Sequence, residues 1–152
     1  LLKASASGME VLAAKKGLQL NASVDESLPR ELYGDEHRLR QIIINLVGNA
    51  IKFTKQGSVP VWLGCDAPDQ WQIRVSDTGV GIPQDAQAYI FDPFRQVSES
   101  ITDDNRGIGL GLAITNQLVQ LMNGKILLES EPGQGTTFTV LLPMRVKAEE
   151  TA

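Results

Sequence analysis

Three polar side chains within the segment 35–57 have the types and the spacing to hold a charged ligand. Asn45, Asn49 and Lys52 are separated by four and then three residues, which places them on one stripe of an α-helix. The apolar residues of this segment lie beside the stripe, so the stripe follows the margin of a buried face. Two amides and an ammonium group suit a hard cation and phosphate oxygens. Taken alone, the same stripe is equally typical of a solvated helix surface.

Two glycine-containing segments could approach a nucleotide. Asp77–Pro83 reads D-T-G-V-G-I-P, and its glycines allow close backbone approaches that a β-carbon would forbid. Its aspartate offers an acceptor for an exocyclic amine such as that of adenine, although the segment alone is also typical of an Asx-capped turn. Gly107–Leu112 reads G-I-G-L-G-L before an expected helix, where free backbone N–H groups bind phosphate. Its spacing is not that of a dinucleotide fingerprint, and the chain has no Walker A motif.

The remaining pattern predicts an α+β fold, a two-layer sandwich, that would position these residues. Apolar residues at helical spacing and apolar–polar alternation predict a mixed sheet of about five strands with the helices packed on one face. The segment 77–106 is long for a connection inside a compact domain, which is typical of functional loops. Helices are expected over 1–16, 35–57 and 110–124, and strands over 18–24, 59–65, 71–76, 125–130 and 136–142.

The composition excludes several classes of function. The 152 residues carry a formal net charge of −4, which argues against non-specific binding of nucleic acid. Cys65 is the one cysteine, so an internal disulfide is excluded and a reducing compartment is indicated. No stretch approaches the roughly 20 apolar residues of a membrane-spanning helix, and we expect no direct membrane contact by this domain. His37 is the one histidine, and we expect it to be a surface residue.

Five segments, in their order along the chain, resemble a known family. They are D-x-x-R-L-x-Q-I-x-x-N-L-x-x-N-A-x-K-F-T at Asp35–Thr54, D-T-G-V-G-I at Asp77–Ile82, F-D-P-F at Phe91–Phe94, G-I-G-L-G-L at Gly107–Leu112 and G-Q-G-T-T-F at Gly133–Phe138. Taken alone, the last is typical of a hairpin turn. Together they resemble the ATP-binding catalytic domain of bacterial sensor histidine kinases, the Bergerat (GHKL) fold shared with gyrase, the MutL repair protein and a heat-shock chaperone. The resemblance covers about residues 18–143 and is greatest to the hybrid sensor kinases.

The resemblance implies a site for ATP and Mg²⁺. On the helix at 35–57, Asn49 would be the Mg²⁺ ligand, with Asn45 beside it near the phosphates. Lys52 would contact phosphate, Phe53 would lie near the sugar and base, and Asp77 would accept the adenine amine. The other implied contacts are Gly79, Gly81 and Ile82 around the ring, Gly107, Gly109, Leu110 and Gly111 on the phosphate side, and Thr136 and Thr137 at the adenine end.

The resemblance also implies an activity and partners. The domain at 18–144 would transfer the γ-phosphoryl group of ATP to a histidine on a separate helical dimerisation domain. The helix at 1–17 would continue from that missing domain, and 145–152 would be a polar tail. Because His37 is not within the sequence motif that surrounds the phosphorylated histidine of this family, we do not expect it to be phosphorylated. We expect a monomer for this piece, a homodimer and a receiver-domain partner for the full-length protein, and a cytoplasmic location within an inner-membrane sensor protein.

One segment departs from the family's usual text. Phe91 and Phe94 would form the hinge of a lid over the site. In this lid, Asp103 and Asp104 occupy positions where related kinases have basic residues, and Arg106 occupies a position where they have glycine. Acidic side chains near a triphosphate repel it, and Arg106 could restore the lost positive charge beside the nucleotide.

There are two alternatives to the assignment as a kinase catalytic domain. One is a degenerate nucleotide-binding or pseudokinase module that acts through protein–protein contacts. The other is an ATP hydrolase of the gyrase type, which is disfavoured because residues 38–42 supply no carboxylate one turn before Asn45.

Overall fold

The computed structural model describes residues 2–28, 34–87, 90–91 and 111–144, without the side chains of 2–7 and 66. The helices and strands expected from the sequence are confirmed there, with shifted ends. In chain order they are α1 (Leu2–Lys15), β1 (Gln19–Val24), α2 (Glu36–Phe53), β2 (Ser58–Ala67), β3 (Gln70–Asp77), α3 (Gly111–Leu121), β4 (Lys125–Glu131) and β5 (Gly135–Pro143).

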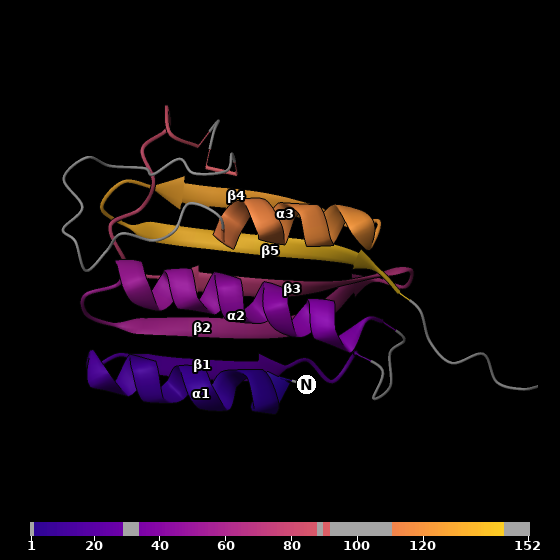
Figure 1. Cartoon of the computed structure of the whole chain (residues 1–152), viewed down its shortest axis with the longest axis horizontal. Helices are drawn as coiled ribbons and strands as arrows, with labels where there is room; N and C mark the ends of the chain where they lie inside the picture. The colour runs from indigo at the N-terminus through magenta and orange to yellow at the C-terminus, as the bar shows by residue number, and fades with distance from the viewer. Residues whose placement is uncertain (1, 29–33, 88–89, 92–110, 145–152) are drawn as a thin grey trace, which may run out of the picture.

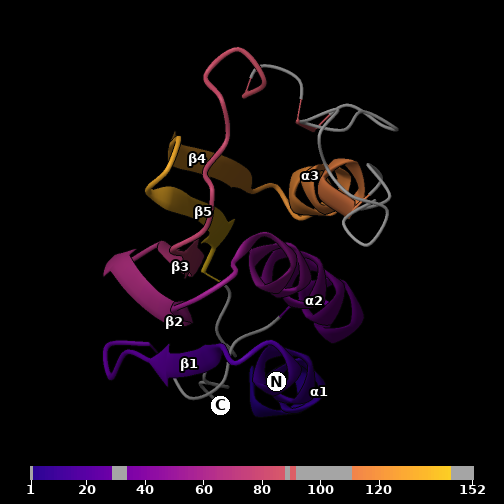
Figure 2. The ribbon, with the colours of Figure 1, turned by 90° about the vertical axis from the view of Figure 1, so that its left-hand side faces the viewer.

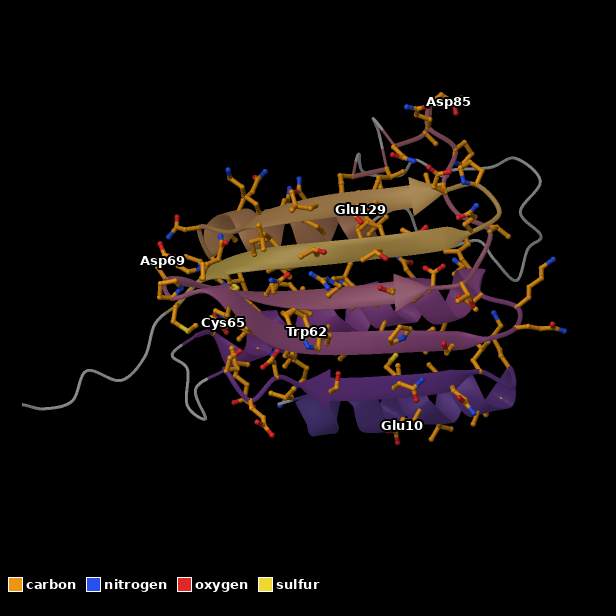
Figure 3. All side chains as sticks on the ribbon, turned by 180° about the vertical axis from the view of Figure 1, so that it is seen from behind. Glu10, Trp62, Cys65, Asp69, Asp85 and Glu129 are labelled. Atoms are coloured by element: carbon orange, nitrogen blue, oxygen red, sulfur yellow. The ribbon has the colours of Figure 1, made fainter. Side chains whose placement is uncertain are left out.

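The described strands form one five-stranded sheet in the order β1-β2-β3-β5-β4. β1 pairs in parallel with β2, and the other three pairings are antiparallel, so the sheet is mixed. The three helices lie side by side on one face of it (Figure 1), and the edge-on view separates one layer of strands from one layer of helices (Figure 2). From behind, the strands are not covered by any described helix (Figure 3). The predicted two-layer α+β sandwich is confirmed.

α2 is the central helix of the core. Asp35 caps its first turn by accepting a hydrogen bond from the backbone N–H of Arg38 at 3.2 Å, as N-terminal carboxylates commonly do. The sequence predicts that this helix continues to Gly57, but it ends at Phe53. Thr54 is extended and completely buried, and its hydroxyl donates to the Ala50 carbonyl at 2.6 Å. Seven residues of α2 are buried against the sheet, namely Leu39, Ile42, Ile43, Leu46, Val47, Ala50 and Ile51.

β1 is the strand that differs most from its prediction. The alternation at 18–24 predicts a half-buried strand, yet Ala22 is exposed and Val24 is 55% exposed. β1 lies at the edge of the sheet and pairs only with β2, so the core surrounds it less completely than the inner strands. Among the described residues, no helix has the length and apolar character needed to cross a bilayer.

Candidate functional site

Four elements end or begin at the same end of the molecule, on the left in Figure 1. α2 ends there at Phe53, β3 ends at Asp77, β5 begins at Gly135 and α3 begins at Gly111. Residues that are far apart in the sequence thereby share one edge of the sandwich, including Lys52 near the end of α2 and Asp77 at the end of β3.

Asp77 is a half-buried acidic residue at this edge. Its Oδ1 accepts a hydrogen bond from the backbone N–H of Gly79 at 2.8 Å, and its backbone is paired with that of Thr136 in β5. Burial raises the pKa of Asp77, while the backbone N–H groups of Gly79 and Thr136 act in the opposite direction. A half-buried carboxylate without a cationic partner among the described residues is well suited to accept a hydrogen bond from a ligand.

We expect acid to stabilise the unaltered protein relative to Asp77→Asn. Because burial raises the pKa of Asp77 above its ordinary value of 3.8, the folded chain binds this proton more tightly than the unfolded chain. The resulting stability is fully present below that ordinary value and is lost as the pH rises through the raised pKa. Asparagine does not titrate, so the wild-type free energy of unfolding minus that of the variant should decrease as the pH rises from 3.8 through the raised pKa. Urea denaturation of both proteins across this range measures it, and a pH-independent difference would contradict it.

Three glycines allow the loop after β3 to pack tightly. A β-carbon on Gly79 would lie 2.4 Å from the carbonyl oxygen of Phe53, and one on Gly81 would lie 2.2 Å from that of Glu131. One on Gly135 would lie 2.1 Å from the carbonyl oxygen of Asp77. The missing β-carbons of Gly79 and Gly81 make room for protein backbone, and the expectation that they also leave room for a ligand ring stays a prediction. The loop is thereby held against both α2 and the β4–β5 turn.

The polar stripe of α2 divides into two roles. Asn45 donates from Nδ2 to the Gly111 carbonyl at 3.4 Å and to the Thr115 hydroxyl at 3.3 Å, so it ties α2 to the first turn of α3. Asn49 is half-buried and makes no hydrogen bond within the described part of the chain. Lys52 is also half-buried, and burial lowers the pKa of its ammonium group. Its Nζ lies 5.6 Å from the centre of the Phe53 ring. Asn49 and Lys52 therefore remain available to a ligand.

Ser130 and Gln87 are two positioning residues that the sequence did not reveal. The Ser130 hydroxyl accepts from the backbone N–H of Ile82 at 2.7 Å and lies 2.9 Å from the Thr136 hydroxyl. Gln87 donates from Nε2 to the carbonyls of Ile82 and Ser130 at 3.0 and 3.2 Å. They clip the loop after β3 to β4 and β5. One signal could have found Ser130, because it takes a sheet position where the alternation of Ile126 and Leu128 predicts an apolar residue.

The side chains of Thr136 and Thr137 lie on opposite faces of the sheet. Adjacent residues of a strand point to opposite faces of the sheet. Thr136 is buried and its hydroxyl lies 2.9 Å from that of the half-buried Ser130, whereas the hydroxyl of Thr137 lies 3.0 Å from that of Ser76 in β3. The expectation that both contact the ligand stays a prediction.

The proposed hinge of the lid is described only in part. The Phe91 ring packs edge-on against Phe138, with centroids 6.3 Å apart. The rest of the predicted lid, with Phe94, Asp103 and Asp104, lies outside the described residues. So do Arg106, Gly107, Gly109 and Leu110.

Comparison with known proteins identifies the family. Residues 34–146 match the family described as histidine kinase-, DNA gyrase B-, and HSP90-like ATPase. The chain belongs to this family. It is 44% identical over 133 residues to the sensor histidine kinase RcsC of Salmonella typhimurium, which covers 88% of this chain and 14% of RcsC. It is 48% identical over 135 residues to the circadian input-output histidine kinase CikA of Synechococcus elongatus, covering 87% of this chain and 17% of CikA.

Solved structures of this ATPase family agree with the fold. The crystal structure of full-length ShkA in complex with AMPPNP superposes with a TM-score of 0.85 at 37% identity, covering 97% of this chain and 30% of ShkA. The catalytic domain of the histidine kinase ThkA superposes with a TM-score of 0.78 at 26% identity, covering 93% of this chain and 90% of that one. The chain is thus a histidine kinase-type ATPase domain by sequence and fold, and it spans about one seventh of the length of RcsC.

Proposed function

We propose that the end of the sandwich between α2 and the loop after β3 binds ATP together with Mg²⁺. The observation that carries the proposal is that three groups occupy one edge of the fold: Asp77, the Asn49 amide, which has no hydrogen-bond partner among the described residues, and the ammonium group of the half-buried Lys52. A carboxylate at one side recognises the adenine amine, and an amide and a cation at the other suit a triphosphate. The AMPPNP complex of ShkA supports this assignment.

The donor set of the described residues fits Mg²⁺. Among them, no group of three or more histidine, cysteine, aspartate or glutamate residues could hold a metal ion. A hard ion here would be held by the Asn49 amide oxygen, phosphate oxygens and water, because Mg²⁺ in nucleotide sites usually keeps several waters and binds substrate phosphates and few protein groups. When bound, Mg²⁺ neutralises charge on the phosphates. Lys52 would add a positive charge to the same phosphates, and Asp77 would fix the position of the base.

The reaction that follows is transfer of the γ-phosphoryl group to a histidine on a helical dimerisation domain of the same protein. The relatives named above are sensor histidine kinases. His37 does not serve as the acceptor, because it is exposed in the first turn of α2, 12 residues before Asn49, or about 18 Å along the helix. In the full-length protein we propose a homodimer, a receiver domain as the next acceptor, and a cytoplasmic location for this domain within an inner-membrane sensor.

The test combines binding with transfer. Calorimetry should detect binding of ATP by the chain in the presence of Mg²⁺ and weaker binding with EDTA. With labelled ATP, the chain alone should gain no stable label, whereas addition of a separately expressed helical acceptor domain from the same full-length protein should produce label on that domain. His37→Gln should leave both results unchanged. Binding without transfer to the added domain would favour the pseudokinase alternative, and absence of ATP binding would remove the proposal.

A further inference from the structure

Lys16 completes the last turn of α2 from another element. The final carbonyls of a helix have no partner inside the helix. Here the Ala50 carbonyl accepts from Thr54, and Nζ of Lys16 donates to the carbonyls of Ile51 at 2.7 Å and Lys52 at 3.0 Å. A lysine at this end of a helix also interacts favourably with the helix dipole. The end of α2 is thus capped by a side chain 35 residues earlier in the chain.

The turn that Lys16 caps belongs to the proposed nucleotide site. Its side chains include Lys52, and Asn49 lies just before it. Its next carbonyl, that of Phe53, is the one against which Gly79 packs without room for a β-carbon. A change in the path of this turn therefore moves the phosphate-side residues and the loop that orients Asp77 relative to each other.

The backbone around Lys16 is itself fixed. Its N–H donates to the Ala13 carbonyl at 3.0 Å, and Ala13 is 1% exposed in the core. Gly17 follows with a φ of +72° and turns the chain into β1, whose first residue, Gln19, donates to the Gly57 carbonyl at 3.2 Å. The backbone of Lys16 is thus fixed between α1 and β1, while its exposed side chain reaches the end of α2.

We propose that Lys16 is a positioning residue for the nucleotide: it holds the last turn of α2 in the conformation that binds ATP, and so links α1 to the site. This inference rests on the proposed function. Loss of the cap should let the last turn fray, and both the phosphate-side residues and the Asp77 loop should then lose their preset geometry.

The experiment measures Kd for AMPPNP with Mg²⁺, and for adenosine by NMR titration, in the unaltered chain and in Lys16→Met, Lys16→Arg and Lys15→Met. Lys15→Met removes the same charge one residue earlier, where the side chain makes no hydrogen bond or ion pair to the described residues. We expect Lys16→Met to raise both Kd values about tenfold, Lys16→Arg to restore most of the affinity because it keeps N–H donors, and Lys15→Met to change little.

Several results would overturn the inference. A lower thermal midpoint with unchanged Kd values would make Lys16 a structural cap only. A loss confined to AMPPNP, equal in Lys15→Met and abolished by high salt, would make it a distant charge that attracts phosphate. If the unaltered chain bound neither ligand, the proposed function would fail and this inference with it. If the unaltered chain bound both ligands and Lys16→Met bound them with the same Kd values, only this inference would fail.

Discussion

Asp77→Asn is expected to weaken ATP binding about 100-fold while leaving the domain folded. The Asp77 carboxylate accepts the backbone N–H of Gly79 at 2.8 Å and would accept the adenine amine with its remaining capacity. An asparagine must turn its NH₂ group toward one of these two donors, so one hydrogen bond becomes a clash of donors. A lost bond to a charged group together with an unsatisfied donor costs about 3 kcal/mol, or roughly 100-fold in Kd. Calorimetry measures the effect.

The choice of base separates this effect from general damage. Inosine triphosphate presents a carbonyl where ATP presents the amine, so the unaltered chain should prefer ATP strongly and Asp77→Asn should lose most of that preference. Asp69→Asn is the matched control, because it makes the same chemical change in the β2–β3 turn at the opposite end of the sheet (Figure 3). Equal affinity of Asp77→Asn and the unaltered chain for ATP would show that this carboxylate does not contact the base.

Gly135→Ala should cause a large loss of stability. Gly135 has a φ of +121°, which L-residues with a side chain rarely adopt, and its β-carbon would lie 2.1 Å from the carbonyl oxygen of Asp77. Backbone strain and overpacking each cost about 1 to 3 kcal/mol, so we expect the free energy of unfolding to fall by about 3 kcal/mol. The displaced Asp77 should also bind ATP more weakly. Urea denaturation and calorimetry measure the two effects.

Gly133→Ala provides the control within the same turn. Gly133 also has a positive φ, +83°, but a β-carbon there would meet no atom within 4 Å. Gly133→Ala should therefore lower the free energy of unfolding only by the conformational strain, about 1 kcal/mol, and leave ATP affinity unchanged. If the two variants lost equal stability, the close approach of Gly135 to Asp77 would not be a determinant of this fold.

The elements could be predicted because their signals are local. α2 is marked by the cap at Asp35 and by apolar residues at helical spacing, and these properties act within a few residues of one another. The prediction ends this helix at Gly57, whereas it ends at Phe53. The next residue, Thr54, is extended and completely buried, and its burial depends on tertiary packing.

The candidate site was predicted where side-chain chemistry is enough to indicate a ligand. Asp77, Asn49 and Lys52 carry groups suited to a nucleotide, and the order of the segments around them points to the ATPase family that the comparisons identify. Roles that depend on neighbours were not predictable. Asn45 reaches Thr115, 70 residues away, and Thr137 faces Ser76 because of strand register.

The amino-acid sequence by itself determined the family, the α+β architecture and the side-chain groups whose chemistry suits a nucleotide, since these follow from residue types and short-range spacing. Only the tertiary structure decided which polar groups form hydrogen bonds within the protein and which stay available to a ligand. It also decided that Lys16 hydrogen-bonds to the end of α2, and that Ser130 and Gln87 hydrogen-bond to the loop after β3, from other elements. Hydrogen bonds and backbone contacts between distant segments depend on how packed layers bring those segments together, and no local pattern encodes that distance.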